Sequence, residues 1–411
     1  MNVWPKTVID RGRQVAALGV IGLAAATLGS PAMAQEVKIG AVMSTTGPLQ
    51  VYGEAGLKGI QLAIDEINEA GGVLGQTVTL VPADDATNPQ VGVDAAQRLV
   101  NVDGVAGIVG ALSSGVTIPI ATTVSATAGV PQISTASTSP VISTLDDGGF
   151  LFRTTPHDAL QGAVLADVVS EQGIDKVAVV YVNNDYGKGL ADAFAGSYGG
   201  EVTASIAYEE RQASYRGELS QAAQGDPEVL VMIAYPGDGI PMLRQALEEG
   251  LFERFVLTDG MKAAEVVDAI GGPLDGSFGT APIGDPEAEA AKIFREAYEA
   301  KFGELPPQPF IDTAYDATML LALAIEKAGT TDGAAVRDAL HEVSKAPGEA
   351  ILPGEFAKAK ELLAAGQDVD YEGAAGSQDF DEAGDVPGTY SHWAIEDSKI
   401  VEVALIRPGG S

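Results

Sequence analysis

The sequence contains no cysteine and only three histidines among its 411 residues. Structural disulfides, thiolate nucleophiles and zinc-thiolate sites are therefore excluded, and little remains for imidazole metal chemistry. The Gly-x-Ser-x-Gly, His-Glu-x-x-His and Walker motifs are absent, and no Gly-x-Gly-x-x-Gly follows the first expected strand. We accordingly expect a protein that is not an enzyme and that uses no metal and no cofactor.

Basic residues are also scarce. Lysine plus arginine number 24 against 57 aspartate plus glutamate, which gives a net charge of −33. A nucleic-acid backbone and an anionic membrane surface repel such a chain, so neither is expected as a partner. Hydrophobic residues make up 46% of the sequence and are sufficient for a large core. Because single cores stop growing at about 250 to 300 residues, two lobes are expected.

The first 34 residues have the composition of an export signal. Three basic residues precede an apolar run over 15–28, and the small residues Ala32 and Ala34 follow it. The run is shorter than the roughly 20 residues that span a bilayer. No cysteine follows residue 34, so the remaining chain offers no site for a lipid anchor. We expect a signal peptide at 1–34 and a periplasmic protein that is not lipid-anchored.

From residue 37 onward, short β-rich runs alternate with amphipathic helical patterns, which is typical of parallel α/β sheets. In the first unit the expected strands are 37–43, 77–81, 105–109 and 130–133, and in the second they are 176–182, 201–207, 229–233 and 255–258. The first helix is expected to end at Gly71 and Gly72, and the second to begin with Asn88 as N-cap and Pro89 as first residue. Helices are expected at 287–302, 311–328 and 334–343, and strand-like pieces at 377–380 and 391–395. The fold class is therefore α/β, with two Rossmann-like lobes.

Ligands of open parallel sheets bind beyond the carboxyl ends of the strands, and several loops there have unusual content. In the first unit the loops 110–115 and 134–140 are rich in small hydroxylic residues, whose hydroxyl and backbone N-H groups suit a carboxylate. In the second unit the strand ends carry Tyr186, Tyr235 and Asp259. Anion-receiving loops opposite an acid and two tyrosines would suit a zwitterion.

Each of these residues also has a purely structural explanation. Ser114 and Thr138 could be helix caps, because serine and threonine favour that position in any protein. Tyr186 and Tyr235 could be aromatic residues at the edge of the core. Asp259, followed by glycine, could belong to an ordinary turn.

At these residues the sequence resembles the type I periplasmic binding proteins of the leucine/isoleucine/valine family, the solute-capturing components of ABC importers. The likeness covers nearly all of the chain after residue 34, and its order and spacing are more specific than any single piece. The segments that carry it are 37–40, 47–53, 59–63, 67–72, 84–85, 152–155, 186–189 and 243–246.

The resemblance implies a role for eight residues. Ser114, Thr138 and the backbone at Ala136 would hold the ligand's α-carboxylate, and Asp259 would face its ammonium group. Tyr186 and Tyr235 would close over the ligand from the second lobe. Tyr52 and Leu112 would line the side-chain pocket from the first lobe.

Two departures from the family pattern bear on this reading. Thr87 and Ser113 stand where some relatives carry a disulfide. Asp259 is one methylene shorter than the glutamate of the branched-chain amino-acid binders, which leaves the substrate class open. The ligand could be a branched-chain-like amino acid, or an aromatic or aliphatic acid or amide without an amine.

The family also implies lobes that close by hinge motion. Lobe 1 is expected at 35–154 and 285–388, lobe 2 at 155–284 and 389–411, with crossings near Arg153, Pro282 and Pro387. Arg153 is interpreted as a structural residue of the crossing. The expected partners of this monomer are a small-molecule ligand and an importer permease. A soluble sensor that passes its bound state to a receptor is the alternative.

Overall fold

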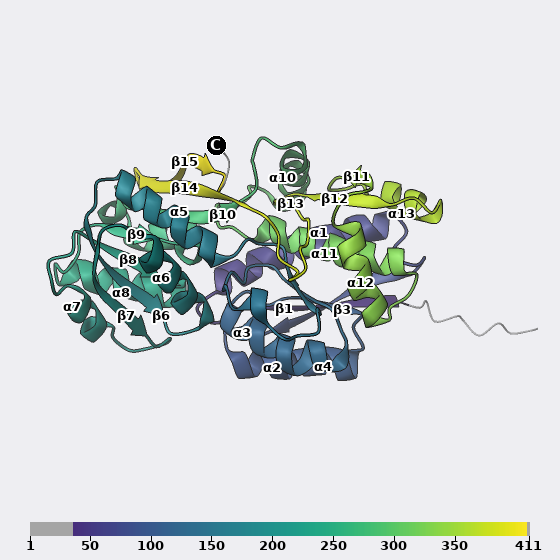
Figure 1. Cartoon of the computed structure of the whole chain (residues 1–411), viewed down its shortest axis with the longest axis horizontal. Helices are drawn as coiled ribbons and strands as arrows, with labels where there is room; N and C mark the ends of the chain where they lie inside the picture. Colours follow the sequence, from purple (N-terminus) through teal and green to yellow (C-terminus); the bar gives the residue numbers. More distant parts are fainter. Residues whose placement is uncertain (1–35, 409–411) are drawn as a thin grey trace, which may run out of the picture. The chain divides into compact units, whose positions relative to one another are not determined.

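The computed structural model describes residues 36–408, so the predicted signal peptide lies outside the described residues. A five-stranded, wholly parallel sheet comes first, in the order β2-β1-β3-β4-β5. Its strands are β1 (Glu36–Met43), β2 (Thr77–Asp84), β3 (Gly107–Gly110), β4 (Gln132–Ser134) and β5 (Leu151–Arg153). Strands β1 and β3 are labelled in Figure 1. Every strand expected in the first unit is present, with β5 in addition.

The second sheet has seven strands in the order β15-β14-β10-β9-β8-β6-β7, of which β14 and β15 run antiparallel to their neighbours. They are β6 (Lys176–Val182), β7 (Glu201–Tyr208), β8 (Val229–Ile233), β9 (Phe255–Leu257), β10 (Phe278–Ile283), β14 (Thr389–Glu396) and β15 (Lys399–Ile406). A small third sheet contains β11 (Glu349–Ile351), β12 (Val369–Gly373) and β13 (Gly376–Ser377). The expected α/β architecture with two Rossmann-like lobes is confirmed.

Helices cover both faces of the first sheet. Successive side chains of its strands point to opposite faces, and the side chains on both faces are buried. Ile39 and Ala41 of β1 pack in the same cluster as α1 and α11, whereas Val42 packs with α2 and α3. The helices of the first part of the chain are α1 (Gln50–Glu69), α2 (Pro89–Arg98), α3 (Ser114–Ile120) and α4 (Ala126–Ala128), with one-turn π segments at Leu99–Asp103 and Ala121–Ser125 and a 3₁₀ turn at Ile142–Thr144.

The later helices divide between the two sheets. Helix α5 packs on α6 and against β10 and β14, while α11 packs on α1 and α12. They are α5 (Asp158–Glu171), α6 (Asp185–Ser197), α7 (Arg216–Ala222), α8 (Pro236–Glu248), α9 (Ala264–Ile270), α10 (Glu289–Phe302), α11 (Ile311–Ala328), α12 (Gly333–Val343) and α13 (Phe356–Ala364), with 3₁₀ turns at Asp259–Met261 and Gly272–Leu274. No helix between residues 36 and 408 combines the length and hydropathy that a membrane span requires.

The predicted helix boundaries follow from local chemistry. The Asn88 side chain accepts hydrogen bonds from the backbone N-H groups of Gln90 and Val91, which confirms it as the N-cap of α2. After α1, Gly71 and Gly72 both have positive φ, at 87° and 68°. A Cβ at Gly72 would lie 1.8 Å from the Gln76 carbonyl oxygen, so this turn requires glycine.

Two differences from the expected strands have physical reasons. The strand-like piece at 377–380 is wrong, because pairing ends at Ser377 and Phe380 instead packs its ring 4.9 Å from that of Phe152. Strand β10 was not expected, since its Gly279 and Pro282 are poor strand formers. Pairing with β9 involves Phe278 and Gly279 alone, so Pro282 lies beyond that ladder and removes no bond from it.

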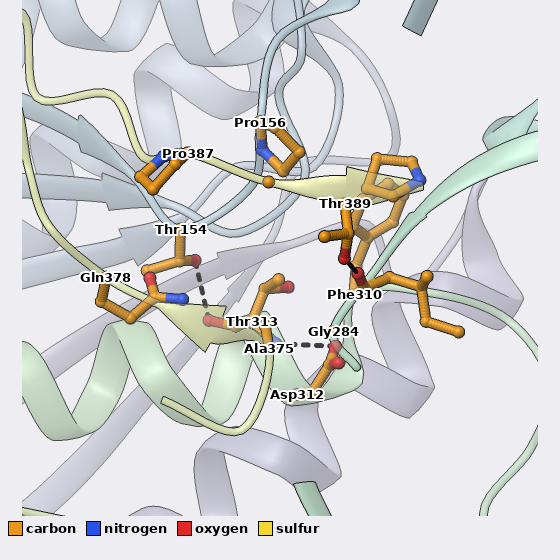
Figure 2. A pocket seen from close by; sticks show the side chains of 13 residues that line it. Thr154, Pro156, Gly284, Phe310, Asp312, Thr313, Ala375, Gln378, Pro387 and Thr389 are labelled. Atoms are coloured by element: carbon orange, nitrogen blue, oxygen red, sulfur yellow. Dashed lines mark hydrogen bonds between the residues drawn. The ribbon is translucent and has the colours of Figure 1, made fainter. Parts of the chain in front are cut away.

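Three chain segments connect the regions of the two large sheets, as expected for a three-strand hinge. They follow β5, follow β10 and precede β14. Residues of all three line one small cavity (Figure 2): Thr154 and Pro156, then Pro282, Ile283 and Gly284, then Pro387, Gly388 and Thr389. The lobe boundaries after residues 154, 284 and 388 remain predictions.

Arg153 anchors the first connection. Its side chain is fully buried and its Nε donates to Asp385 Oδ1 at 2.6 Å. Its Nη1 donates to the carbonyl oxygens of Ser137 and Ser139, at 3.2 and 2.9 Å. The arginine thus ties the loop after β4 to the segment before β14, which agrees with its interpretation as structural.

Candidate ligand site

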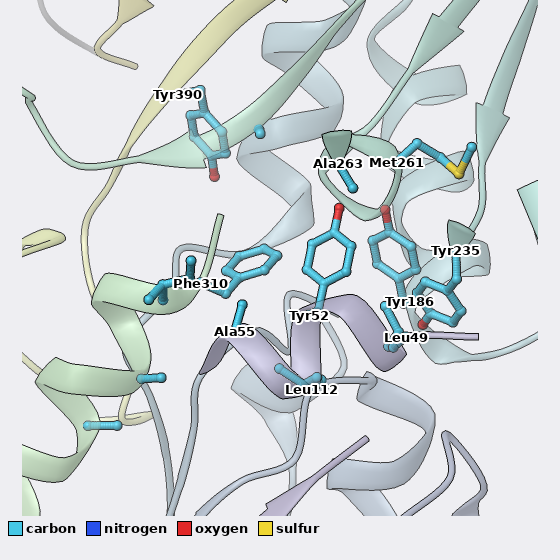
Figure 3. Close-up of a cluster of buried hydrophobic side chains, with 14 of the residues drawn as sticks. Leu49, Tyr52, Ala55, Leu112, Tyr186, Tyr235, Met261, Ala263, Phe310 and Tyr390 are labelled. Atoms are coloured by element: carbon cyan, nitrogen blue, oxygen red, sulfur yellow. The ribbon is translucent and has the colours of Figure 1, made fainter. Parts of the chain in front are cut away.

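A small cavity with about 20 Å³ of free space lies between the strand ends of the two large sheets. Much of its wall is aromatic or aliphatic, and Figure 3 draws side chains of this part, among them Tyr52, Leu112 and Phe310. It is lined by Leu49, Tyr52, Leu112, Ser114, Ala136, Tyr186, Tyr235, Asp259, Gly260 and Phe310. Seven of the eight residues singled out from the sequence therefore meet around one cavity.

Thr138 is the exception. It does not line the cavity, and its hydroxyl is buried without a hydrogen-bond partner among residues 36–408. The hydroxyl lies beside the Asp158 carboxyl, where it lowers the pKa of that acid without a hydrogen bond of ordinary geometry. Thr138 is therefore placed behind the cavity wall, and the ligand roles of all eight residues remain predictions.

The first-sheet side of the cavity presents backbone and hydroxyl donors. Ser114 begins α3 directly after β3, and its Oγ accepts from the backbone N-H of Ser139 at 3.2 Å. The backbone N-H groups of Ser114 and Ala136, which line the cavity, donate to no described residue. Unpaired N-H groups near a helix start are suited to an anion.

The second-sheet side presents a carboxylate held by two donors. Asp259 Oδ1 accepts from Gln161 Nε2 at 2.7 Å and from the Tyr186 hydroxyl at 2.9 Å. Burial raises the pKa of Asp259 to about 6, although both hydrogen bonds lower it. The Tyr186 ring stacks on Tyr235, with ring centres 5.5 Å apart and planes 14° from parallel.

Hydrogen bonds cross the cavity from one side to the other. The Tyr52 hydroxyl on α1 donates to the Asp259 carbonyl oxygen at 2.7 Å. Gly237 N-H donates to the Pro48 carbonyl oxygen at 3.1 Å, and the hydroxyls of Ser113 and Tyr235 lie 3.1 Å apart. These cross-cavity bonds enclose the site without using its carboxylate or its free N-H groups.

Sequence reasoning missed three lining residues, the glutamine that donates to Asp259, and a second buried acid near it. Phe310 packs against Tyr52, with ring centres 6.4 Å apart, from a backbone of positive φ (78°) just before α11. Leu49 and Gly260 lie close in sequence to Tyr52 and Asp259, which had already been singled out. Asp158 and Gln161 lie one turn apart at the start of α5, and their polar spacing on a buried helix face was the available signal.

Residues 36–408 contain no group of three or more histidine, aspartate or glutamate side chains arranged to hold an ion. The site itself is a mainly apolar cavity with an acid on one side and free N-H donors on the other.

Comparison with known proteins agrees with this description. A sequence model of the family "Periplasmic binding protein" matches residues 36–368. A Leu/Ile/Val-binding protein homolog of Brucella melitensis is 33% identical over 77% of this chain and 87% of its own. A chemotactic signal transduction substrate-binding protein, BasB of Halobacterium salinarum, is 29% identical over 91% of both chains.

The fold has equally extensive counterparts. The crystal structure of LivJ, a branched-chain amino acid transporter substrate-binding protein of Streptococcus pneumoniae in complex with isoleucine, superposes with a TM-score of 0.77. It shares 27% identity and covers 91% of this chain and 100% of its own. The chain belongs to the periplasmic binding protein family, and within it to the type I, leucine/isoleucine/valine group. It is a solute-binding protein and not an enzyme.

Proposed function

We propose that this protein captures a small, branched-chain-like amino acid as the extracytoplasmic component of an ABC importer. One observation carries the proposal: a single apolar cavity has a buried carboxylate, Asp259, on one side and unpaired backbone N-H groups on the other. A zwitterion with an apolar side chain complements all three features. The names of the Brucella and Streptococcus relatives support the same ligand class.

In this binding mode the ligand's carboxylate meets neutral hydrogen-bond donors, and its ammonium group meets a negative charge. The ligand carboxylate accepts hydrogen bonds from Ser114 and the backbone at Ala136, with Thr138 behind them. Its ammonium pairs with Asp259, and its side chain packs against Tyr52 and Leu112. Lobe closure removes water from the ion pair and from the hydrogen bonds to the carboxylate, which strengthens them. It also gives the permease a distinct conformation to recognise. In this proposal the protein is located in the periplasm and is a monomer.

A sensor function is the second candidate. The Halobacterium relative is named as part of a chemotactic signal transduction system, so the same scaffold can serve a receptor there. Neighbouring permease and ATPase genes would favour import, whereas a neighbouring receptor gene would favour sensing.

A thermal-shift panel tests the ligand class. The purified protein is heated with leucine, isoleucine or valine, and with two matched compounds for isoleucine: the acid without the amine, and the amide without the carboxylate. A ligand at about 1,000 times its Kd adds roughly 4 kcal/mol to the free energy of unfolding and raises Tm by several degrees.

The matched compounds separate the possibilities. Stabilisation by isoleucine but by neither analogue supports the zwitterion site. Stabilisation by amine-free acids, aromatic ones included, would keep the N-H groups as the carboxylate site and remove the ammonium from Asp259. No shift with any of these compounds would contradict the proposed ligand class.

A further inference from the structure

Asp158 is a buried carboxyl group that the proposed binding mode does not use. It is the first residue of α5 and is fully buried. Neither Oδ1 nor Oδ2 has a hydrogen-bond partner among residues 36–408. A buried ionised carboxylate without partners is costly, so this environment favours the neutral acid.

Asp158 is linked to the ligand cavity through Asp259. Gln161 lies one helical turn after Asp158, and its amide donates to Asp259 Oδ1 at 2.7 Å. The Oε1 of Gln161 is buried and unpaired like both oxygens of Asp158. Burial raises the pKa of Asp158 well above its usual range, and the nearby charge of Asp259 raises it further.

One cation and several acidic or polar groups surround Asp158. The ionisable or polar groups around Asp158 are Asp259, Tyr186 on α6, Tyr390 on β14, Arg153 on β5 and Thr138 in the loop after β4. Arg153 is the cation of this set and lowers the pKa of Asp158, but its donors are already bound to Asp385, Ser137 and Ser139. The start of α5 also favours a negative charge. These effects oppose burial without supplying Asp158 a hydrogen-bond partner.

We propose that Asp158 is a positioning residue that holds a proton until the ligand's ammonium group binds at Asp259, and that ligand capture then releases this proton to solvent. The proposal rests on the proposed function. On release, the O-H bond of Asp158 breaks, its electron pair stays on the carboxylate, and the proton passes to the buffer. The proton had kept Asp158 and Asp259 from carrying two negative charges close together. In the complex, the positive charge of the ammonium offsets the second negative charge instead.

The reason is electrostatic. An opposite charge within about 4 to 6 Å lowers a carboxyl pKa by about one to three units. Asp259 accepts two side-chain hydrogen bonds that favour its ionised form, whereas Asp158 accepts none among residues 36–408. Of the two carboxyl groups, Asp158 is therefore the one to which we assign the proton.

Calorimetric titration with isoleucine tests the coupling. The binding enthalpy is measured near neutral pH in phosphate and in Tris, whose ionisation enthalpies differ, and the difference counts the protons released. For the wild type we expect the release of close to one proton per isoleucine bound. The Kd should accordingly fall about tenfold for each unit by which the pH rises. We expect close to zero protons for Asp158→Asn, and the wild-type count for Asp167→Asn, an exposed acid on the same helix.

A second measurement does not depend on the variant's folding. The infrared difference spectrum of the wild type should lose the absorption of one protonated carboxyl group when isoleucine is added. Isoleucine binding without proton release, or an unchanged count in folded Asp158→Asn, would overturn the proposal and leave the proposed function intact. Absence of binding by isoleucine, leucine and valine would instead overturn the proposed function, and this proposal with it.

Discussion

Two buried carboxyl groups of this protein, Asp316 and Asp158, have opposite surroundings. Asp316 on α11 accepts hydrogen bonds from the Tyr371 hydroxyl and from the backbone N-H groups of Ala374 and Ala375, each at 2.8 Å. Asp158 accepts none from the described part of the chain. Both are fully buried, so burial alone does not distinguish them.

The difference distinguishes an acid whose hydrogen bonds are satisfied within the fold from one whose hydrogen bonds are not. Asp316 holds the strand β12 and the turn after it to α11, and three donors satisfy it within the fold. Even so, burial raises its pKa to about 7. Asp158 and Asp259 share a region where hydrogen bonds are too few for two negative charges. A bound cation would therefore be stabilised in this region. The surroundings of Asp316 offer a cation no such stabilisation, because three donors already satisfy its carboxylate.

The largest expected effect comes from removing the carboxylate of Asp316, the acid whose hydrogen bonds are satisfied. Asp316→Ala leaves one hydroxyl and two N-H groups buried without an acceptor. We expect a loss of about 3 to 5 kcal/mol in the free energy of unfolding, measured by urea denaturation, because each unsatisfied buried group costs about 1 to 3 kcal/mol. Ligand affinity should stay within about twofold. Asp167→Ala, an exposed change, is the control, and equal stability of the two variants would contradict the role of Asp316.

The second effect is on affinity. Asp259→Asn leaves the ligand's ammonium without its counter-charge in a closed cavity. Binding of isoleucine, measured by calorimetry, should weaken by about 2 to 5 kcal/mol. Asp167→Asn should leave affinity unchanged. An unaltered Kd in Asp259→Asn would show that the ligand's amine does not meet this residue.

The third effect has the opposite sign to the first. Asp158→Asn should raise the stability of the ligand-free protein above about pH 7, by about 1 to 3 kcal/mol, because it removes a buried carboxyl without partners. Since the folded-state pKa is raised, the native state keeps a proton that the unfolded state loses, and wild-type stability falls as pH rises above about 4. The gain should therefore vanish near pH 4. A gain independent of pH would contradict this account.

The smallest effect tests the support of Asp259. Tyr186→Phe keeps the stacked ring and removes one hydrogen bond to the carboxylate. We expect isoleucine affinity to fall by about 1 kcal/mol. Because this bond lowers the pKa of Asp259, the loss should be larger near pH 6 than near pH 8. Equal losses at both pH values would show that the hydroxyl acts by geometry alone.

The sequence revealed those parts of the site that follow strands. Tyr186, Tyr235 and Asp259 each come just after a buried strand, so the topology of a parallel sheet brings them together. Phe310 follows a proline-rich connector, and neither periodicity nor a strand end marks it. Its place depends on the packing of α11 against α1, which is a property of the tertiary structure.

Asp158 escaped notice for a different reason. An acid at the first position of a helix is commonplace, because it complements the helix dipole. What makes Asp158 unusual is the absence of partners, which depends on how β5, β10 and β14 converge around α5. Strand β10 itself was missed because of its glycine and proline, so this convergence could not be foreseen.

The cross-cavity bonds bear on how long a ligand stays. The bonds from Tyr52 to the Asp259 carbonyl and from Gly237 to the Pro48 carbonyl join protein to protein. If the proposed lobes must part for release, these bonds must break whichever ligand is inside. The residence time would then contain a component common to all ligands, set by residues such as Gly237 that do not line the cavity. Selectivity among ligands would depend on the cavity walls, whereas the dissociation rate would depend partly on these two cross-cavity hydrogen bonds.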